Sequence, residues 1–563
     1  MKSDVQIAAE AKLKPISAIA ATLGIPNKYI EFYGEHKAKI AIDILKNLRQ
    51  RKRSKYIVVT GITPTHLGEG KTVTTVGLSM ALNRMGRRSC ACLRQPSMGP
   101  FFGVKGGGVG GGYSRVAPED DINLHLTGDI HAVTQAHNLA ASFLDNHLYR
   151  GNALGIDPER IYWRRVMDVN DRALRSVKIG LGGGESGVER STGFDITAAS
   201  EVMAILALSE SIPDMRKRLG RIVLALTRSA KPVTCDDIKV AGSMAAILTD
   251  AVNPNLVQTI ENTPAFIHTG PFANITHGNS SILADRIALG LADYVVTEAG
   301  FGADCGLEKF VNIKCRAGSL KPAAAVLVAS VRALKIHSGV LKMVVGKPLG
   351  RELSLENLDL LDAGCVNLEK QIENVRLYGI PCIVAINRFA TDTAREIDLV
   401  RRKALEVGAF SCVTSDVYRY GSRGGLELAR AAADACEAGG RFNYLYPLDM
   451  PIERKIETIA VKVYGAKGVH FEKRAEENIK IYKKMGFSNL PVCMAKTHLS
   501  LSHDPKIKGS PRDFVLPVRD VRPSIGAGFL YALCGRILTM PSLPSHPVGE
   551  HIDIDAKGRV KYV

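Results

Sequence analysis

Apolar runs alternating with amphipathic segments form the main pattern of this chain. Five runs have the length and composition of buried strands, at 56–62 (YIVVTGI), 221–227 (RIVLALT), 294–300 (YVVTEAG), 324–330 (AAVLVAS) and 382–387 (CIVAIN). Segments with apolar residues at helical spacing lie between them. One of these, 200–220, begins at Ser200, a residue type suited to cap a helix N-terminus. Strands alternating with helices predict an α/β fold built around mostly parallel or mixed sheets.

A chain of 563 residues is too long for one hydrophobic core, so we expect a multi-domain architecture. The Gly-rich segment 337–358 and the segment 443–451 (NYLYPLDMP) are the candidate junctions. They divide the chain into residues 1–345, 346–445 and 446–563. The tail, 542–563, has proline turns followed by an alternating IDID and a turn at AKG, which predicts an edge hairpin.

Composition narrows the class of protein. Hydrophobic residues make up 46% and charged residues 23% of the chain, as in ordinary globular enzymes. No apolar run approaches the roughly 18 residues that a membrane helix needs, and the N-terminus lacks the apolar core of a signal peptide. Eleven scattered cysteines favour reduced thiols in a cytoplasm.

The net charge of +18 raises the question of nucleic acid. Part of the basic excess lies in 46–56, a connection between a predicted helix and a strand, and part in 472–484, a mixed-charge amphipathic helix. Neither is accompanied by a zinc finger or by interleaved aromatic residues. We therefore expect no nucleic-acid partner, and a polyanionic substrate is a sufficient use for the charge.

The loop after the first apolar run carries the most informative motif. TGITPTHLGEGKTVTT, at 60–75, ends a strand and begins a helix, the arrangement that directs backbone N–H groups at a phosphate. It matches the phosphate-binding loop GxxxxGKT except that Thr65 replaces the first glycine. Lys71 would reach the β- and γ-phosphates and the Thr72 hydroxyl would reach magnesium. The alternative is a tight turn with an incidental lysine.

Three other segments carry candidate site residues. Arg94 follows a short apolar stretch, where its guanidinium could fork onto a carboxylate or phosphate. The glycine run at 103–113 suits a backbone that approaches a ligand closely, or else a flexible surface loop. Phe389 and Tyr418 lie in loops after strand-like runs, where aromatic rings either pack locally or clamp a flat heterocycle.

The segment 121–138 contains three histidines and two acids, a composition that suggests a metal. However, His125, His131 and His137 are six residues apart, which fits neither HExxH nor one helix face. We expect structural roles for most of these histidines. Asp129, next to a glycine, is the residue that we retain as a site candidate.

Several long motifs occur together and in order: ITPTHLGEGKT, CLRQPSMGP, KGGGVGGG, INLHLTGDIHAVTQAHNLAA, TGFDITAASEVMA, NPNLVQTIENTPAFIH, GPFANITHG and ADYVVTEAGFGAD. In these motifs the chain resembles formate–tetrahydrofolate ligase, from about Val5 to its end. The resemblance implies three domains, a homotetramer and a cytoplasmic setting. It also implies that ATP phosphorylates formate to formyl phosphate, from which tetrahydrofolate takes the formyl group, giving 10-formyltetrahydrofolate, ADP and phosphate.

The resemblance assigns roles to individual residues. Lys71 and Arg94 would be catalytic, Arg94 as the residue that binds formyl phosphate. The nucleotide site would comprise Thr65, His66, Leu67, Gly68, Glu69, Gly70, Lys71 and Thr72, with Thr72 as a magnesium contact. Substrate would meet Arg94, Gly106, Gly107, Phe389 and Tyr418, the last two as the faces of a folate clamp. Gln95 and Asp129 would belong to a monovalent-cation region. In domain terms, 1–345 would hold the P-loop and formyl-phosphate site, 346–445 would contribute the folate site, and 446–563 would be a C-terminal α+β domain.

The chain departs from the family pattern near the expected folate and cation sites. Gln95 replaces a glutamate associated with the monovalent-cation response, which puts that cation in doubt. Tyr418 replaces the clamp tryptophan, Tyr420 a lysine and Arg423 a glutamate. The nucleotide loop is unchanged. The alternatives are therefore a divergent paralogue with another substrate or no activity, and a nucleotide-dependent switch or assembly protein.

Overall fold

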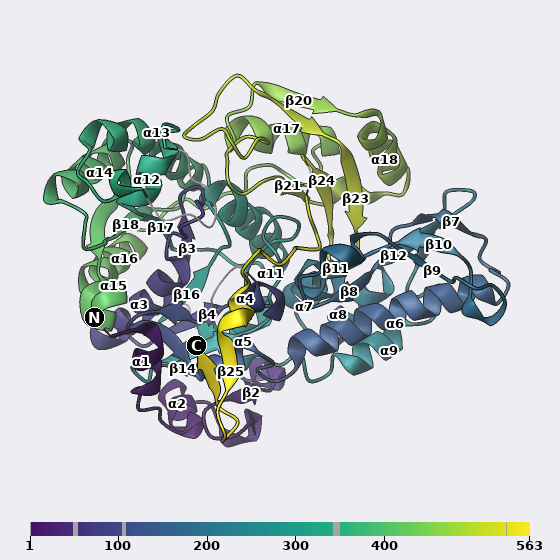
Figure 1. Cartoon of the computed structure of the whole chain (residues 1–563), viewed down its shortest axis with the longest axis horizontal. Coiled ribbons are helices and arrows are strands. Elements are labelled where there is room, and N and C mark those ends of the chain that lie inside the picture. The colour runs from purple at the N-terminus through teal and green to yellow at the C-terminus, as the bar shows by residue number, and fades with distance from the viewer. Residues whose placement is uncertain (1, 49–53, 104–107, 342–349, 536, 563) are drawn as a thin grey trace.

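A large mixed sheet forms the centre of the protein (Figure 1). The structure is a computed structural model that describes residues 2–48, 54–103, 108–341, 350–535 and 537–562. The strand order is β1 (Ile30–Phe32), β2 (Ala38–Ile40), β14 (Asn255–Thr259), β15 (Pro264–Ile267), β4 (Ser89–Leu93), β16 (Tyr294–Glu298), β3 (Lys55–Gly61), β17 (Ala324–Ala329), β18 (Cys382–Asn387) and β19 (Ser411–Ser415). In addition, β6 (Ser114–Ala117) pairs with β14, and β5 (Gly110–Gly111) pairs with β6. Neighbours from β15 to β19 are parallel, and β1, β2, β6 and β14 pair antiparallel. The predicted α/β fold is confirmed.

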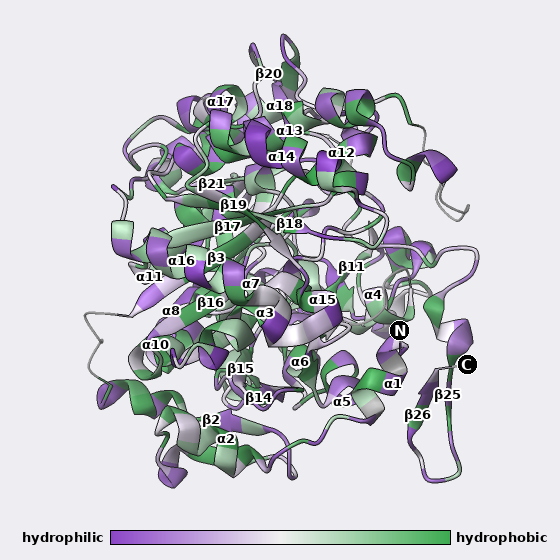
Figure 2. Ribbon diagram, turned by 90° about the vertical axis from the view of Figure 1, so that its left-hand side faces the viewer, coloured by the Kyte–Doolittle hydropathy of each residue, from purple (hydrophilic) through white to green (hydrophobic). Residues whose placement is uncertain are grey.

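The central strands are apolar on both faces because helices cover both. In β3, Val58 contributes to one core together with residues of the helices α2 (Ile16–Leu23), α10 (Ile282–Leu291), α13 (Leu358–Arg376) and α14 (Ala394–Glu406). Its neighbours Ile57 and Val59 pack on the other face, against α3 (Lys71–Arg84) and α16 (Leu426–Ala438). Each such side chain stabilises the fold by about 1.5–3 kcal/mol. Figure 2 shows this arrangement as hydrophobic strands inside a shell of helices with hydrophilic outer faces.

Four of the five predicted strands lie in the large sheet, but the run at 221–227 does not. Its strand, β12 (Val223–Thr227), forms a separate antiparallel sheet with β13 (Pro232–Thr234) and β7 (Ile156–Ile161). Only residues 228–231 separate β12 from β13, which allows a hairpin but not the longer crossover that a parallel neighbour requires. This run therefore forms a strand outside the large sheet.

The predicted helix at 200–220 is two helices, α7 (Glu201–Leu208) and α8 (Ile212–Gly220). Ser200 caps α7 as predicted, since its side chain accepts a hydrogen bond from the Val202 N–H. The break arises because Ser211 caps a second helix and Pro213 lies in its first turn, where a proline is tolerated.

A second region extends from the large sheet on the right of Figure 1. It contains α6 (Asp129–Tyr149), α9 (Ala241–Ile247) and the β7–β12–β13 sheet. Two small sheets belong to it as well, one formed by β8 (Arg165–Met167) and β11 (Phe194–Ile196), the other by β9 (Val177–Ile179) and β10 (Arg190–Thr192). We call this region, residues 129–252, the lateral unit.

The C-terminal unit, residues 446–535, lies above the lateral unit in Figure 1. It contains α17 (Ile452–Lys462), α18 (Lys473–Lys484), the pair β20 (Gly468–Phe471) and β22 (Val515–Val518), and the sheet of β21 (Val492–Ala495), β24 (Phe529–Leu533) and β23 (Asp520–Ser524). The predicted tail hairpin forms from β25 (Ile552–Ile554) and β26 (Val560–Tyr562). It is a sheet of its own rather than the edge of a larger one.

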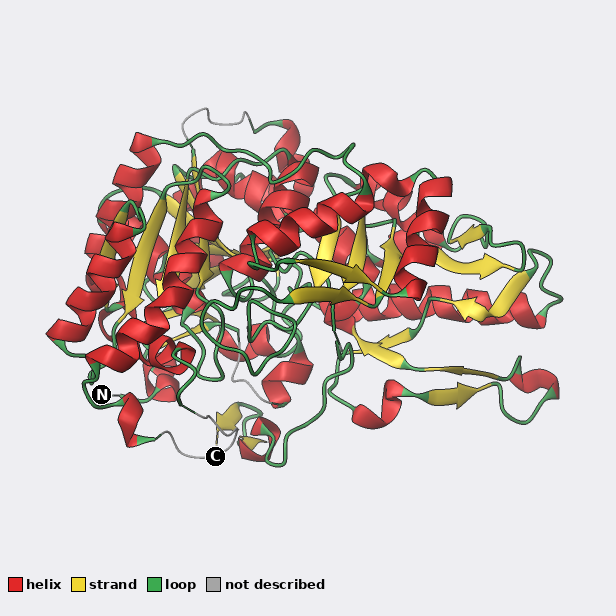
Figure 3. Ribbon diagram, turned by 90° about the horizontal axis from the view of Figure 1, so that it is seen from above, coloured by secondary structure: helices red, strands yellow, loops and turns green. Residues whose placement is uncertain are grey.

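Short helices complete the fold: α1 (Asp4–Ala9), α4 (Met98–Phe102), α5 (Glu119–Asn123), α11 (Arg316–Gly318), α12 (Val331–His337), α15 (Val417–Tyr420) and the π-helical turns Ala303–Leu307 and Phe310–Cys315. Seen from above, helices cover both sides of the large sheet (Figure 3). β18 and β19, from the predicted domain 346–445, continue the sheet that begins in 1–345. The domain boundaries stay a prediction. None of the described helices is long and apolar enough to cross a membrane.

Candidate active site

Three neighbouring parallel strands bring their carboxyl ends together at one edge of the large sheet. The strands are β4, β16 and β3, in that spatial order. Glu298, the last residue of β16, pairs with Val59 of β3, and the preceding Thr297 pairs with Cys92 of β4. Arg94 follows β4 directly, and the glycine loop follows β3. This edge is where open α/β sheets bind their ligands.

The loop 62–70 has a backbone shaped by glycines and by one carboxylate. Gly68 and Gly70 have φ of 74° and 80°, a left-handed conformation that favours glycine. A Cβ on Gly70 would also lie 2.5 Å from Nδ2 of Asn387, which donates to the Glu69 carbonyl oxygen at 3.2 Å. The Glu69 side chain closes the loop by accepting from the Thr65 N–H at 2.7 Å. These two hydrogen bonds therefore fix the loop before the first turn of α3.

The remaining loop residues either form local contacts or are exposed. The Thr65 hydroxyl accepts from the Leu67 N–H at 3.2 Å, and His66 and Gly68 are exposed. Lys71 begins α3, and its Nζ lies 3.4 Å from Oε2 of Glu69. The Lys71 charge thus has a weak partner, at the N-terminus of a 14-residue helix that favours anions.

Glu298 contacts both Thr72, a predicted nucleotide-site residue, and Arg94, the residue predicted to bind formyl phosphate. The Thr72 hydroxyl donates to its Oε2 at 2.7 Å, and Arg94 donates from Nε to its Oε1 at 3.3 Å. Arg94 therefore contacts the carboxylate by one edge of its guanidinium, and Nη1 lies beside Gly300. Sequence reasoning missed Glu298. Its signal was a carboxylate that ends an apolar run, TEAG, in a sheet already expected to bind ligands at strand ends.

Thr72 and Glu298 together fit a magnesium ion. A hydroxyl that follows the loop lysine and a carboxylate at the end of the neighbouring strand are the protein ligands that nucleotide-bound magnesium uses. The described residues contain no cluster of three or more His, Cys, Asp or Glu side chains that could hold a metal alone.

Buried polar groups surround Arg94. His277 is fully buried, and neither ring nitrogen has a hydrogen-bond partner among the described residues. Burial, with the positive charges of Lys314 and Arg94, holds the pKa of His277 well below its usual value, so the ring is neutral. The Gln95 side chain is 2% exposed, and its amide is also unpaired within the described ranges. Unpaired buried polar groups cost about 1–3 kcal/mol each, so a polar ligand or water that paired with these two side chains would be stabilised.

Gln95 and Asp129, the predicted cation region, contact different parts of the protein. The Gln95 N–H donates to the Thr269 carbonyl oxygen at 2.7 Å. The Asp129 carboxylate accepts from Lys39 Nζ and from Asn255 Nδ2, each at 2.7 Å, and is almost completely buried. Lys39 therefore already supplies a positive charge to this carboxylate. A monovalent-cation site at these residues stays a prediction.

The three histidines of 121–138 divide into two settings. His137 stacks on Trp163 with ring centroids 3.9 Å apart, and burial lowers its pKa to about 3. This histidine is neutral and structural. His125 and His131 line a small cavity of about 200 Å³ with Asp168, and none of the assigned site residues that the structure describes lines it.

Phe389 and Tyr418 lie beyond the ends of β18 and β19. The Arg332 guanidinium lies 4.3 Å from the centroid of the half-buried Phe389 ring. Tyr418 donates from its hydroxyl to Asp4 Oδ1 at 2.8 Å, and its ring packs on Gly111 and Gly112. In the described structure no ring contact joins the two aromatics, and the folate clamp stays a prediction. Gly106 and Gly107 lie outside the described residues.

Known proteins of one family are similar to this chain over its whole length. The sequence model of a family described as formate–tetrahydrofolate ligase matches residues 2–563. A formate–tetrahydrofolate ligase of Roseiflexus castenholzii is 56% identical over 561 residues, 100% of both chains. The ligase of Saccharopolyspora erythraea is 56% identical over 558 residues, 99% of each chain. That of Desulforamulus reducens is 53% identical over 557 residues, 99% of this chain and 98% of its own.

Proposed function

Because the chain belongs to the formate–tetrahydrofolate ligase family, we propose that it joins formate to tetrahydrofolate with ATP. The products are 10-formyltetrahydrofolate, ADP and phosphate. The observation that supports this most directly is that Glu298 contacts both Arg94 and Thr72, the residue that follows Lys71 at the start of α3. This arrangement places a phosphate-binding helix N-terminus beside a guanidinium suited to a carboxylate or acyl phosphate.

The reaction needs both the phosphate-binding N-terminus of α3 and the Arg94 guanidinium. Formate is a poor electrophile because its negative charge repels nucleophiles. When a formate oxygen attacks the γ-phosphorus, the bond to ADP breaks and formyl phosphate forms. Lys71 and the N-terminus of α3 stabilise the negative charge on the phosphates, and Arg94 holds the formate carboxylate in line. Magnesium, held by Thr72 and Glu298, would neutralise further phosphate charge.

The second step transfers the formyl group. The N10 amine of tetrahydrofolate attacks the formyl carbon, phosphate leaves, and N10 loses its proton. Arg94 can stay on the phosphate throughout, because Glu298 contacts only its Nε. The neutral His277 lies close enough to Arg94 for that charge to depress its pKa. It therefore adds no positive charge to the site. The Phe389 and Tyr418 rings would bind the pterin in this step. A homotetramer in the cytoplasm, with magnesium as cofactor, completes the proposal.

One assay tests the proposed function. Purified protein is incubated with ATP, magnesium, formate and tetrahydrofolate, and 10-formyltetrahydrofolate and ADP are measured with each substrate omitted in turn. Formation of both products only in the complete mixture supports the proposal. ATP hydrolysis that is independent of formate would favour a paralogue with another substrate. Slow ATP hydrolysis without folate binding would favour the nucleotide-dependent switch.

The uncharged side chain of Gln95 leads to a prediction about how activity depends on potassium. A carboxylate here would add a negative charge beside Arg94 that attracts a monovalent cation, whereas the amide adds none. We expect weak potassium dependence in the natural protein. Gln95→Glu should tighten apparent potassium binding by about tenfold, and the uncharged Gln95→Asn should not. Activity is measured against potassium concentration at constant ionic strength, and a steep rise for the natural protein would contradict the prediction.

We expect the Phe389 ring to contribute to the affinity for folate. Phe389→Ala should raise the KM for tetrahydrofolate by about fivefold and leave that for ATP nearly unchanged, because a stacked ring contributes about 0.5–1.5 kcal/mol beyond its buried area. Tyr418→Trp should lower the same KM, since indole offers a larger stacking face. Phe410→Ala, at an exposed position before β19, is the matched control.

A different result would indicate that the two rings only support their loops. In that case Phe389→Ala would lower the melting temperature and impair the use of ATP and of folate alike. Measuring both constants and the melting temperature on this variant separates the two roles. Equal effects on the two substrates would rule out the clamp.

A further inference from the structure

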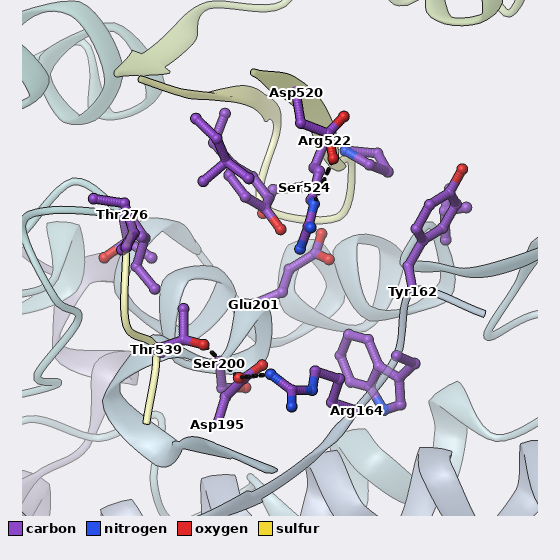
Figure 4. A pocket seen from close by; sticks show the side chains of 18 of the residues that line it. Tyr162, Arg164, Asp195, Ser200, Glu201, Thr276, Asp520, Arg522, Ser524 and Thr539 are labelled. Carbon is purple, nitrogen blue, oxygen red and sulfur yellow. Dashed lines mark hydrogen bonds and ion pairs between the residues drawn. The ribbon is translucent and has the colours of Figure 1, made fainter. Parts of the chain in front are cut away.

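A cavity of about 460 Å³ lies between the lateral unit and the C-terminal unit (Figure 4). The lateral unit contributes residues around Tyr162, Arg164 and Glu201, and the C-terminal unit contributes β23 and β24. The cavity has the size of a small-molecule site. None of the described residues assigned above to ATP, formate, folate or cations lines it.

Among the described residues, four arginines from the two units line this cavity: Arg164, Arg474, Arg519 and Arg522. Arg474 and Arg522 share one carboxylate oxygen, Oδ2 of Asp520, at 3.2 and 3.0 Å. Arg519 reaches Glu472 only at 3.8 Å. Each of these three contacts runs through Nε and is a single contact, so none is the two-bond fork by which a carboxylate engages a guanidinium most strongly.

Besides Asp195, Glu472 and Asp520, the carboxyl group of Glu201 lines the cavity, and it is only partly ionised near neutral pH. Glu201 begins α7, and its Oε1 accepts from the Gly526 N–H at 2.8 Å and the Ala527 N–H at 3.2 Å. Burial nevertheless raises its pKa to about 7. Four guanidiniums of the described lining therefore face four carboxyl groups, and the raised pKa of Glu201 weakens the negative charge on one of these near neutral pH.

Hydroxyl groups and one aromatic wall complete the lining. Figure 4 shows Arg522 and Glu201 extending into the same part of the cavity, with Arg164 and Ser200 on the opposite side and Tyr162 at one end. Arg164 is held by Asp195 at 2.8 Å, and Trp163 is fixed by its stacking on His137. Guanidiniums beside hydroxyl donors match the oxygen atoms of phosphate or carboxylate groups.

From this geometry we propose that the cavity is a second binding site, for a small molecule that carries phosphate or carboxylate groups. The loop 268–281 lies between this cavity and the edge of the large sheet where Arg94 lies. Ile275 and Thr276 line the cavity, and the next residue, His277, lies by Arg94. A ligand in the cavity therefore contacts one side of a loop whose other side borders Arg94, and it is positioned to alter the KM for formate.

Isothermal titration calorimetry tests the binding directly. The full-length protein is saturated with magnesium and a non-hydrolysable ATP analogue, and inorganic phosphate and citrate are titrated in separate experiments to distinguish phosphate from carboxylate. We expect at least one of them to bind with a Kd of about 1 mM or lower. Arg522→Gln should weaken this binding by about tenfold, and Arg522→Lys, which keeps the charge, should weaken it less.

Further variants test whether the measured heat of binding arises at this cavity. Glu201→Gln removes a negative charge and should tighten anion binding at pH 8 by about tenfold. This gain cannot come from misfolding, which would only weaken binding. Arg395→Gln, at an exposed arginine of α14 that pairs with Glu356, is the matched control and should bind as the natural protein does. Absence of binding by both anions, or binding that Arg522→Gln and Glu201→Gln leave unchanged, would overturn the proposal.

Discussion

Replacing Lys71 with alanine is expected to lower ATP-dependent turnover by about 100- to 1,000-fold, the usual effect of removing one charged contact to a reacting group. Lys71 begins α3, and its Nζ lies 3.4 Å from Oε2 of Glu69. This long ion pair leaves the ammonium able to exchange its partner for phosphate. Removing Lys71 should change stability little, because Glu69 keeps the hydrogen bond that it accepts from the Thr65 N–H at 2.7 Å.

The measurement is kcat and KM for ATP, with thermal unfolding of the same variant. Lys55→Ala is the matched control, since Lys55 lies at the opposite end of β3 and pairs with Glu437 near the surface. It should leave turnover unchanged. If Lys71→Ala folds normally and turns over at the natural rate, the nucleotide site is not at this loop.

Glu298→Gln has the second-largest expected effect, a loss of about 100-fold in turnover with a raised requirement for magnesium. Glu298 accepts the Thr72 hydroxyl and Arg94 Nε on its two oxygens. The amide keeps the shape of the side chain but offers one acceptor and no charge. Magnesium would lose a ligand, and Arg94 would lose the contact that orients it. Both reaction steps should therefore slow.

Titrating magnesium at saturating ATP separates the two causes. An activity that recovers in part at high magnesium identifies Glu298 as a metal ligand, and an activity that stays low identifies it as the residue that positions Arg94. Glu437→Gln, at an exposed carboxylate that pairs with Lys55, is the control. Natural turnover and natural magnesium dependence in Glu298→Gln would show that Glu298 has neither role.

The elements predicted correctly from the sequence depend on short stretches of chain. Four apolar runs became strands of the large sheet because each is apolar over its whole length and is therefore stable only when buried on both faces. The run at 221–227 had the same composition but took an antiparallel partner across a four-residue connection, 228–231. Composition predicts a buried strand, whereas its neighbours are set by connections and packing.

The sequence by itself determined the strand–loop–helix unit at 55–84, with Lys71 and Thr72 at the first turn of α3. It could do so because glycine conformations and helix N-termini are local properties of consecutive residues. Only the tertiary structure decided that Glu298, 226 residues from Thr72, receives its hydroxyl. The arginine-lined cavity likewise joins two units through Arg164 and Arg522. Such contacts follow from strand order and from the packing of distant segments, which leave no periodic or local trace in the chain.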